Sequence, residues 1–187
     1  EPPVRAAILP YPAHLERQVV IQGASARLRP VRPDDAARLV ELVDRSTPDD
    51  VHARFAGGLR HLSPEFAARL AQVDYDRHLA LVIEGPEGDL WGVGRLVSDP
   101  AGESAEFALL IRSDMQHRGI GGRLLEALVD RAREMGLGRV WGEVARGNSK
   151  MLVLAAEHGF TLCGSDDPVR ARVERVVPAT VGDTTPT

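Results

Sequence analysis

The stretch Gln116-His117-Arg118-Gly119-Ile120-Gly121-Gly122 lies between a β-rich run, 105–112, and a strongly helical segment that begins near Gly119. A strand that leads through glycines into a helix start makes an anion site, because the backbone can approach the ligand closely and the helix dipole adds partial positive charge. Phosphate is the natural ligand of such a turn. The alternative is that the glycines only let the helix start pack tightly against a neighbour.

Two other glycine-rich motifs are excluded by what surrounds this turn. No Gly-Lys-Ser/Thr ending follows it, which a P-loop requires. A Rossmann fingerprint needs a parallel βαβ unit, whereas the β-rich runs 79–84, 91–97 and 105–112 are separated by turn signals and predict an antiparallel meander.

The remaining segments extend this pattern in both directions. Helices are expected at 36–43, 48–55, 63–73, 119–135 and 148–158, and further strands at 19–21, 27–30, 139–145, 160–164 and 169–177. The order predicts an α/β fold with a mixed, mainly antiparallel sheet flanked by helices. In the chain of 187 residues, we expect 1–24 to be a linker or N-terminal extension, 25–177 to be one folded domain and 178–187 to be a flexible tail. The chain begins at Glu1 without a methionine, so we expect processing or excision from a longer protein.

The composition excludes several classes of function. The formal net charge of -4 argues against a general nucleic-acid binder. The single cysteine, Cys163, excludes an internal disulfide framework and a cysteine-rich metal site, and no metal is expected. No apolar run approaches the roughly 20 residues of a membrane helix, and no signal peptide opens the chain. We therefore expect a cytoplasmic protein with no membrane partner.

Two motifs resemble those of the GNAT superfamily of acetyl-CoA-dependent N-acetyltransferases. Gln116, Gly119 and Gly121 match its signature, Gln/Arg-x-x-Gly-x-Gly/Ala. Asn148 and the Gly-Phe pair at 159–160 match its second motif, an Asn that begins a helix and a Gly-Phe that follows it. The resemblance implies direct transfer of an acetyl group from acetyl-CoA to an amine.

The likeness covers about residues 27–176 and implies that the sheet splays after Ile111, with acetyl-CoA in the splay. By this resemblance, Leu110 and Ile111 offer backbone groups to the thioester and the pantetheine, and residues 118–123 cradle the pyrophosphate. Asn148 would contact the pantetheine arm. The complete set expected to bind acetyl-CoA is Leu110, Ile111, Arg112, His117, Arg118, Gly119, Ile120, Gly121, Gly122, Arg123, Asn148 and Met151.

Glu106 is the expected general base, since similar members of the family place a glutamate on the strand before the signature. A lysine amine has a pKa of about 10.4, so it is protonated at neutral pH and must lose a proton before it attacks a thioester. The alternative is a strand glutamate that simply faces solvent. No general acid can be named, because Ala155 stands where many family members carry a tyrosine.

A closer resemblance is to the acetyltransferase domain of bacterial Pat-type protein lysine acetyltransferases, on the stretches 11–16, 28–35, 63–65, 74–77 and 105–108. It implies that the acceptor is the active-site lysine of an AMP-forming acyl-CoA synthetase, and that the domain is joined to a larger regulatory domain. Two alternatives stay open: a small-molecule amine N-acetyltransferase and a non-catalytic acyl-CoA-sensing module. Residues 74–77 either receive a basic target loop or form a capped turn.

Overall fold

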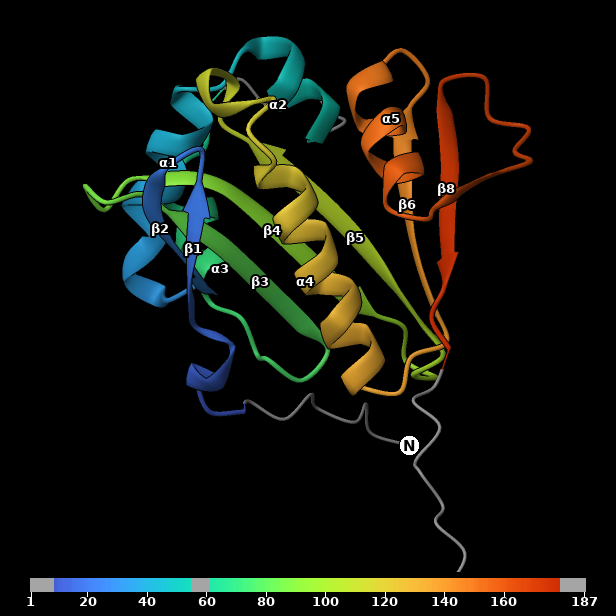
Figure 1. Cartoon of the computed structure of the whole chain (residues 1–187), viewed down its shortest axis with the longest axis horizontal. Helices are drawn as coiled ribbons and strands as arrows, with labels where there is room; N and C mark the ends of the chain where they lie inside the picture. Colours follow the sequence, from blue (N-terminus) through green and yellow to red (C-terminus); the bar gives the residue numbers. More distant parts are fainter. Residues whose placement is uncertain (1–8, 55–60, 179–187) are drawn as a thin grey trace, which may run out of the picture.

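The computed structural model describes residues 9–54 and 61–178 of the chain. Within these residues, eight strands form one sheet in the order β1-β2-β3-β4-β5-β6-β8-β7, with helices on both faces (Figure 1). The strands are β1 (Arg17–Ile21), β2 (Ala24–Pro30), β3 (His78–Glu84), β4 (Leu90–Ser98), β5 (Ser104–Ile111), β6 (Arg139–Ala145), β7 (Thr161–Cys163) and β8 (Arg170–Val176). The α-helices are α1 (Ala36–Asp44), α2 (Pro48–Arg54), α3 (Pro64–Ala71), α4 (Ile120–Glu134) and α5 (Ser149–Glu157), and short 3-10 turns cover Ala13–Leu15, Pro33–Asp35 and Ser113–Met115.

All neighbouring strands pair antiparallel except β5 and β6, which are parallel. The predicted α/β fold with a mixed, mainly antiparallel sheet is therefore confirmed. Each predicted helix and strand is present, with ends that differ by a few residues. Phe55, the predicted end of the second helix, and residues 179–187 of the predicted tail lie outside the described residues.

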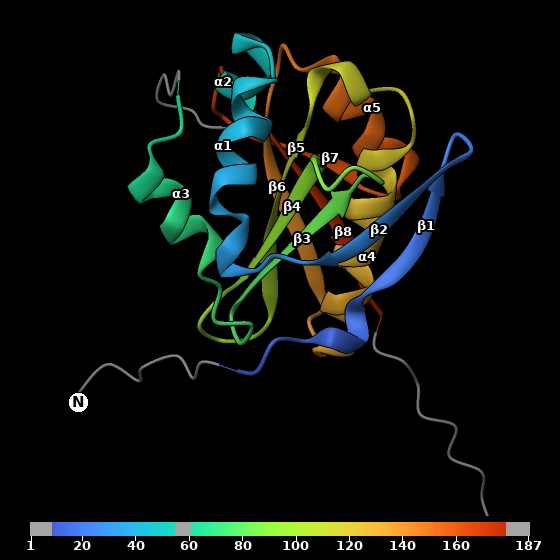
Figure 2. The ribbon, with the colours of Figure 1, turned by 90° about the vertical axis from the view of Figure 1, so that its left-hand side faces the viewer.

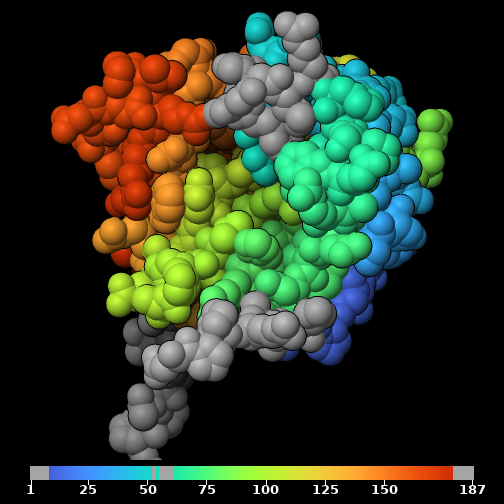
Figure 3. Space-filling model, turned by 180° about the vertical axis from the view of Figure 1, so that it is seen from behind, coloured from blue at the N-terminus to red at the C-terminus, as the bar shows by residue number. Residues whose placement is uncertain are grey.

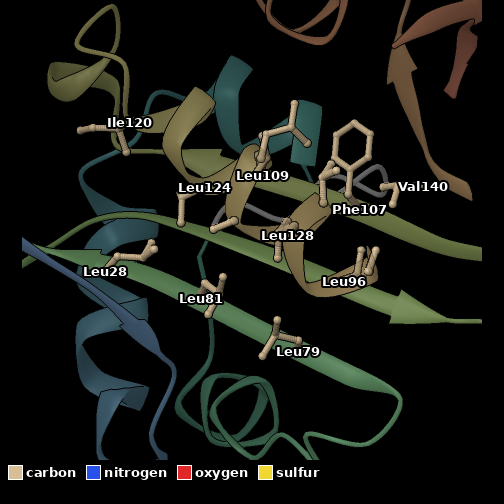
Figure 4. Close-up of a cluster of buried hydrophobic side chains, with 14 of the residues drawn as sticks. Leu28, Leu79, Leu81, Leu96, Phe107, Leu109, Ile120, Leu124, Leu128 and Val140 are labelled. Carbon is tan, nitrogen blue, oxygen red and sulfur yellow. The ribbon is translucent and has the colours of Figure 1, made fainter. Parts of the chain in front are cut away.

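The two faces of the sheet carry separate hydrophobic cores. Helix α4 covers one face together with α5, whereas α1 and α3 cover the other (Figure 2). On α4, Leu124 and Leu128 are one turn apart and fully buried against the sheet (Figure 4). On the opposite face, Leu39 and Leu42 of α1 pack with Val82 of β3.

The segment predicted as a linker, 1–24, contains strand β1, which pairs with β2 at the edge of the sheet. Val19 and Ile21 alternate with exposed neighbours and are buried. Just before the strand, Glu16 accepts a hydrogen bond from Nη2 of Arg32 at 2.8 Å. Folded structure therefore begins before residue 25, because alternating apolar residues give this short strand a buried face.

Strands β5 and β6 separate within the sheet, as Figure 1 shows. Their backbone pairing ends at Glu106, so the sheet opens there. The expectation that it opens after Ile111 is therefore wrong. The ring of Phe107 packs against β6 just beyond this point. It packs so closely on β6 that a Cβ added at Gly142 would lie 2.6 Å from it, and its centroid is 5.1 Å from that of Phe160.

Residues 74–77 form a capped turn, which is one of the two roles that the sequence suggested for them. Oδ1 of Asp74 accepts hydrogen bonds from the backbone N–H groups of residues 76–78 at 2.9 to 3.0 Å. The hydroxyl of Tyr75 donates to the carbonyl oxygen of Val31. These contacts give the turn a structural role between α3 and β3.

Two absences hold for the described part of the chain. None of its helices has both the length and the apolar character needed to cross a membrane. Its His, Cys, Asp and Glu side chains form no group of three or more that could hold a metal ion.

Candidate active site

A cleft with a volume of about 710 Å³ opens where β5 and β6 separate. Residues Glu106 to Ile111 of β5 form one wall, and residues of β6 and α5 form the other. Helix α2 contributes Asp50 and Arg54. Figure 3 shows residues of β4 and β5 uncovered between α3 and the strands β6 and β8. Glu106 lies at the narrow end, where strand pairing stops, and the glycine turn follows the other end of β5.

The glycine turn has the backbone geometry of an anion site. Gly119 is the N-cap of α4 and has a φ of 83°, in the left-handed region that favours glycine. His117 also has a positive φ, of 61°. Ile120, Gly121 and Gly122 line the cleft, and the first N–H groups of a helix have no acceptor within it. The positive end of the α4 dipole therefore lies at the cleft.

Gly121 and Gly122 also determine how closely α5 approaches α4. A Cβ at Gly121 would lie 2.9 Å from Cδ2 of Leu154, and one at Gly122 would lie 2.6 Å from Nε2 of His158. Gly119 differs, because the position of its Cβ is open and only its backbone conformation favours glycine. Tight packing, the alternative reading of the glycines, thus applies to two of them and backbone geometry to the third.

Glu106 presents its side chain to the cleft. Burial raises the pKa of this carboxyl above its ordinary value, and the negative charge of Glu143 on β6 raises it further. Arg54, Arg172 and Arg170 act on this pKa in the opposite direction. A carboxylate with a raised pKa is suited to accept a proton near neutral pH. Glu106 does meet solvent, but it does so within the cleft.

Four polar residues, which we call the Asp50 network, join three elements around the cleft: Asp50, Ser113, Gln116 and Lys150. Oδ2 of Asp50 accepts hydrogen bonds from Oγ of Ser113 at 2.6 Å and from Nε2 of Gln116 at 2.8 Å. Nζ of Lys150 donates to Oε1 of Gln116 at 2.7 Å and lies 3.9 Å from Oδ1 of Asp50. The side chain of Gln116 therefore connects α2 with α5.

Most of the site residues that the sequence predicted line the cleft: Glu106, Leu110, Ile111, His117, Gly119, Ile120, Gly121, Gly122, Asn148 and Met151. Arg118 and Arg123 are exposed but are not among the residues that line it. Arg112 is 5% exposed, and its guanidinium lies 2.6 Å from both Asp89 and Asp114. Its side chain is thus engaged in ion pairs outside the cleft.

Asn148 contributes to the site partly as a helix cap, because its Oδ1 accepts a hydrogen bond from the backbone N–H of Met151 at 3.2 Å. The sequence did not indicate Asp50, Arg54 or Glu143. Asp50 and Arg54 are four residues apart on one helix, but no sequence signal places that helix beside β5. The alternation of residues along β6 gives a weak indication of the side that Glu143 faces. Whether that side lies on the cleft depends on where β5 and β6 separate.

Comparisons with known proteins agree with this architecture. A family model described as an acetyltransferase (GNAT) domain matches residues 26–161. Acetyltransferase PA5475 of Pseudomonas aeruginosa is 29% identical over 149 residues, which cover 78% of this chain and 79% of that protein. Acetyltransferase Pat of Mycolicibacterium smegmatis is 31% identical over 126 residues, or 66% of this chain and 38% of that protein.

Among solved structures, the GNAT domain of S. lividans PAT superposes with a TM-score of 0.83 and 30% identity, covering 89% of this chain and 99% of that domain. Proteins that share the fold at 16 to 19% identity have been solved with CoA or acetyl-CoA bound. The family match spans well over half of the chain, and the likeness to the S. lividans domain extends across nearly all of that domain. The chain therefore belongs to the GNAT acetyltransferase family, and it is an N-acetyltransferase.

Proposed function

We propose that the chain transfers the acetyl group of acetyl-CoA to the side-chain amine of a lysine in a protein, with Glu106 as general base. The observation that carries this proposal is a single cleft lined both by the glycine turn and by a carboxylate with a raised pKa. The turn suits a pyrophosphate because helix amides and a positive dipole end meet there. The carboxylate suits a proton acceptor.

Acetyl-CoA lies along β5 in this proposal. Residues 118–123 hold the pyrophosphate, and the backbone of Leu110 and Ile111 contacts the pantetheine and the thioester. Asn148 and Met151 complete the contacts from α5, whose first turn lines the cleft. The thioester is then placed towards Glu106, at the narrow end.

The acceptor amine arrives as an ammonium ion, because the pKa of lysine is about 10.4. Glu106 accepts one proton, and the free amine attacks the thioester carbon. The new C–N bond forms and the C–S bond breaks, so that CoA leaves as a thiolate. Ala155 is fully buried and offers no proton. The nitrogen loses its second proton as the amide forms, and water, or the hydroxyl of Ser149 in the cleft, passes this proton to the thiolate.

The proposed acceptor is the active-site lysine of an AMP-forming acyl-CoA synthetase. The similarity to the GNAT domain of S. lividans PAT and to Pat of M. smegmatis supports a protein acceptor. The uncovered face beside β5 leaves room for a folded partner, and Glu106 and Glu143 favour a cationic side chain. Such a synthetase makes acetyl-CoA, so acetylation of its lysine would close a feedback loop.

Mass spectrometry of a purified acetyl-CoA synthetase, incubated with this protein and acetyl-CoA, tests the proposal. We expect acetylation of the catalytic lysine, and its loss when the protein carries Glu106→Gln. Parallel reactions contain spermidine or an aminoglycoside as the acceptor. Rapid acetylation of either amine with an unmodified synthetase would assign a small-molecule acceptor. Normal binding of acetyl-CoA with no product in any reaction would indicate a sensing module.

Replacement of Glu143 by Gln is expected to lower the pKa of Glu106, since it removes a neighbouring negative charge. The base works only when deprotonated, so the acidic limb of the pH profile of kcat/KM should move to lower pH. Rates measured across about pH 5.5 to 9 check this. Glu157→Gln is the matched control, because Glu157 also lines the cleft but is not among the charges that act most strongly on the pKa of Glu106. An acidic limb that stays in place in Glu143→Gln contradicts the prediction.

A further inference from the structure

Helix α2 places two charged residues of one face on the cleft, Asp50 and Arg54. They are four residues apart, so their side chains lie one above the other on the helix. Asp50 reaches Gln116, which begins the glycine turn. Arg54 interacts electrostatically with Glu106, at the narrow end of the cleft. One short helix therefore spans from the glycine turn to the proposed base.

Helix α2 depends on side-chain contacts for its position. Its range, Pro48–Arg54, covers only seven residues, and helices of this length are not stable by themselves. Asp50 anchors it through Oδ2 to Ser113 and Gln116, at 2.6 and 2.8 Å. Oγ of Ser113 also accepts a hydrogen bond from the backbone N–H of Thr47 at 2.7 Å, just before the helix. The hydrogen bonds of Thr47 and Asp50 are therefore both made to the segment that follows β5.

Within residues 9–54 and 61–178, the charges that act most strongly on the pKa of Glu106 come from three elements. Arg54 lies on α2, Glu143 lies on β6, and Arg170 and Arg172 lie on β8. The strand residues are fixed by the ladder between β6 and β8. Arg54 enters the cleft from α2, so the position of α2 affects where its guanidinium lies relative to Glu106.

We propose that Asp50 is a positioning residue for the acetyl transfer: by anchoring α2 to Ser113 and Gln116, it holds Arg54 beside Glu106. The inference rests on the proposed role of Glu106 as base. Arg54 then stabilises the carboxylate that must accept the proton. Nζ of Lys150, on α5, also donates a hydrogen bond to Gln116. Residues from both walls of the cleft therefore contribute to the position of α2.

The experiment compares Asp50→Ala, Arg54→Gln and the double variant in pH profiles of kcat/KM with a saturating concentration of acetyl-CoA. Loss of a positive charge beside Glu106 raises its pKa, so the acidic limb should move to higher pH in both single variants. On the acidic limb of the profile, the rate relative to that at about pH 9 should fall roughly threefold or more. The double variant should resemble Arg54→Gln alone, because Asp50 acts through Arg54.

Three further variants separate this role from others. Asp49→Asn, the neighbouring residue on the same helix, should leave the profile in place. Asp50→Asn keeps one acceptor oxygen and should shift the limb less than Asp50→Ala does. Glu106→Gln should reduce turnover by about 100-fold or more at every pH; if it does not, the proposed base is wrong, whatever the Asp50 variants do.

The inference is overturned if Arg54→Gln moves the limb and Asp50→Ala does not, or if the two shifts add in the double variant. Circular dichroism melting curves establish that each variant is folded at the assay temperature. If Asp50→Ala is unfolded there, Asp50→Asn alone and with Arg54→Gln gives the same test. The inference would also be overturned if Asp50→Asn shifted the acidic limb of the Arg54→Gln variant by as much as it shifts the acidic limb of the unchanged protein.

Discussion

Glu106→Gln is expected to reduce turnover by about 100-fold or more, while the affinity for acetyl-CoA stays close to that of the unchanged protein. The amide has nearly the shape of the carboxylate but cannot accept the proton of the acceptor ammonium. Glu106 lies on the wall of the cleft and outside both hydrophobic cores, so the fold should persist. Steady-state kinetics with the synthetase, together with a calorimetric titration of acetyl-CoA, measures both quantities.

Glu103→Gln serves as the control for this variant. Glu103 is an exposed glutamate in the turn before β5 and is not among the residues that line the cleft. Its replacement should leave turnover unchanged. If Glu106→Gln retained full turnover at about pH 7, the proton acceptor would have to be another group of the cleft.

Gly121→Glu is expected to weaken acetyl-CoA binding by about 100-fold or more. Gly121 lies in the first turn of α4, and its Cβ would already be 2.9 Å from Leu154. A longer side chain must displace Leu154 or extend into the cleft. Its negative charge would then stand beside the proposed pyrophosphate site. Contact between like charges costs several kcal/mol, and each 1.4 kcal/mol is a factor of ten in affinity.

Gly164→Glu adds the same side chain where nothing lies within 4 Å of the new Cβ. It should bind acetyl-CoA normally, which separates a local effect from a change in net charge. Gly121→Ala should fall between the two, because Leu154 has a flexible end that can move. A calorimetric titration that gives an ordinary affinity for Gly121→Glu would place the phosphates elsewhere.

Local signals in the sequence were enough to predict the elements and the glycine turn. Ser63 and Pro64, for example, indicate the start of α3, and Oγ of Ser63 accepts a hydrogen bond from the N–H of Phe66 at 3.2 Å. The turn and Glu106 belong to one strand–turn–helix segment. They lie on the same cleft because they are close together in the sequence.

Features that depend on contacts between distant segments were missed. The sheet opens at Glu106, next to the contact between Phe107 and Gly142, which lies on another strand. Arg112 is adjacent to the turn in sequence, but Asp89, at the end of a different hairpin, holds its guanidinium away from the cleft. Composition and periodicity do not contain these pairings.

The engagement of Lys150 with Gln116 has a practical consequence for isotope labelling. Lys150 is the only lysine among the 187 residues, and its Nζ donates a hydrogen bond to Oε1 of Gln116 at 2.7 Å, so self-acetylation of a lysine side chain has one position available. In a reaction with radioactive acetyl-CoA, the transferase therefore offers little background incorporation of its own. Nearly all protein-bound radioactivity would report on the acceptor, so even a slow substrate in a mixed extract would stand out on a gel.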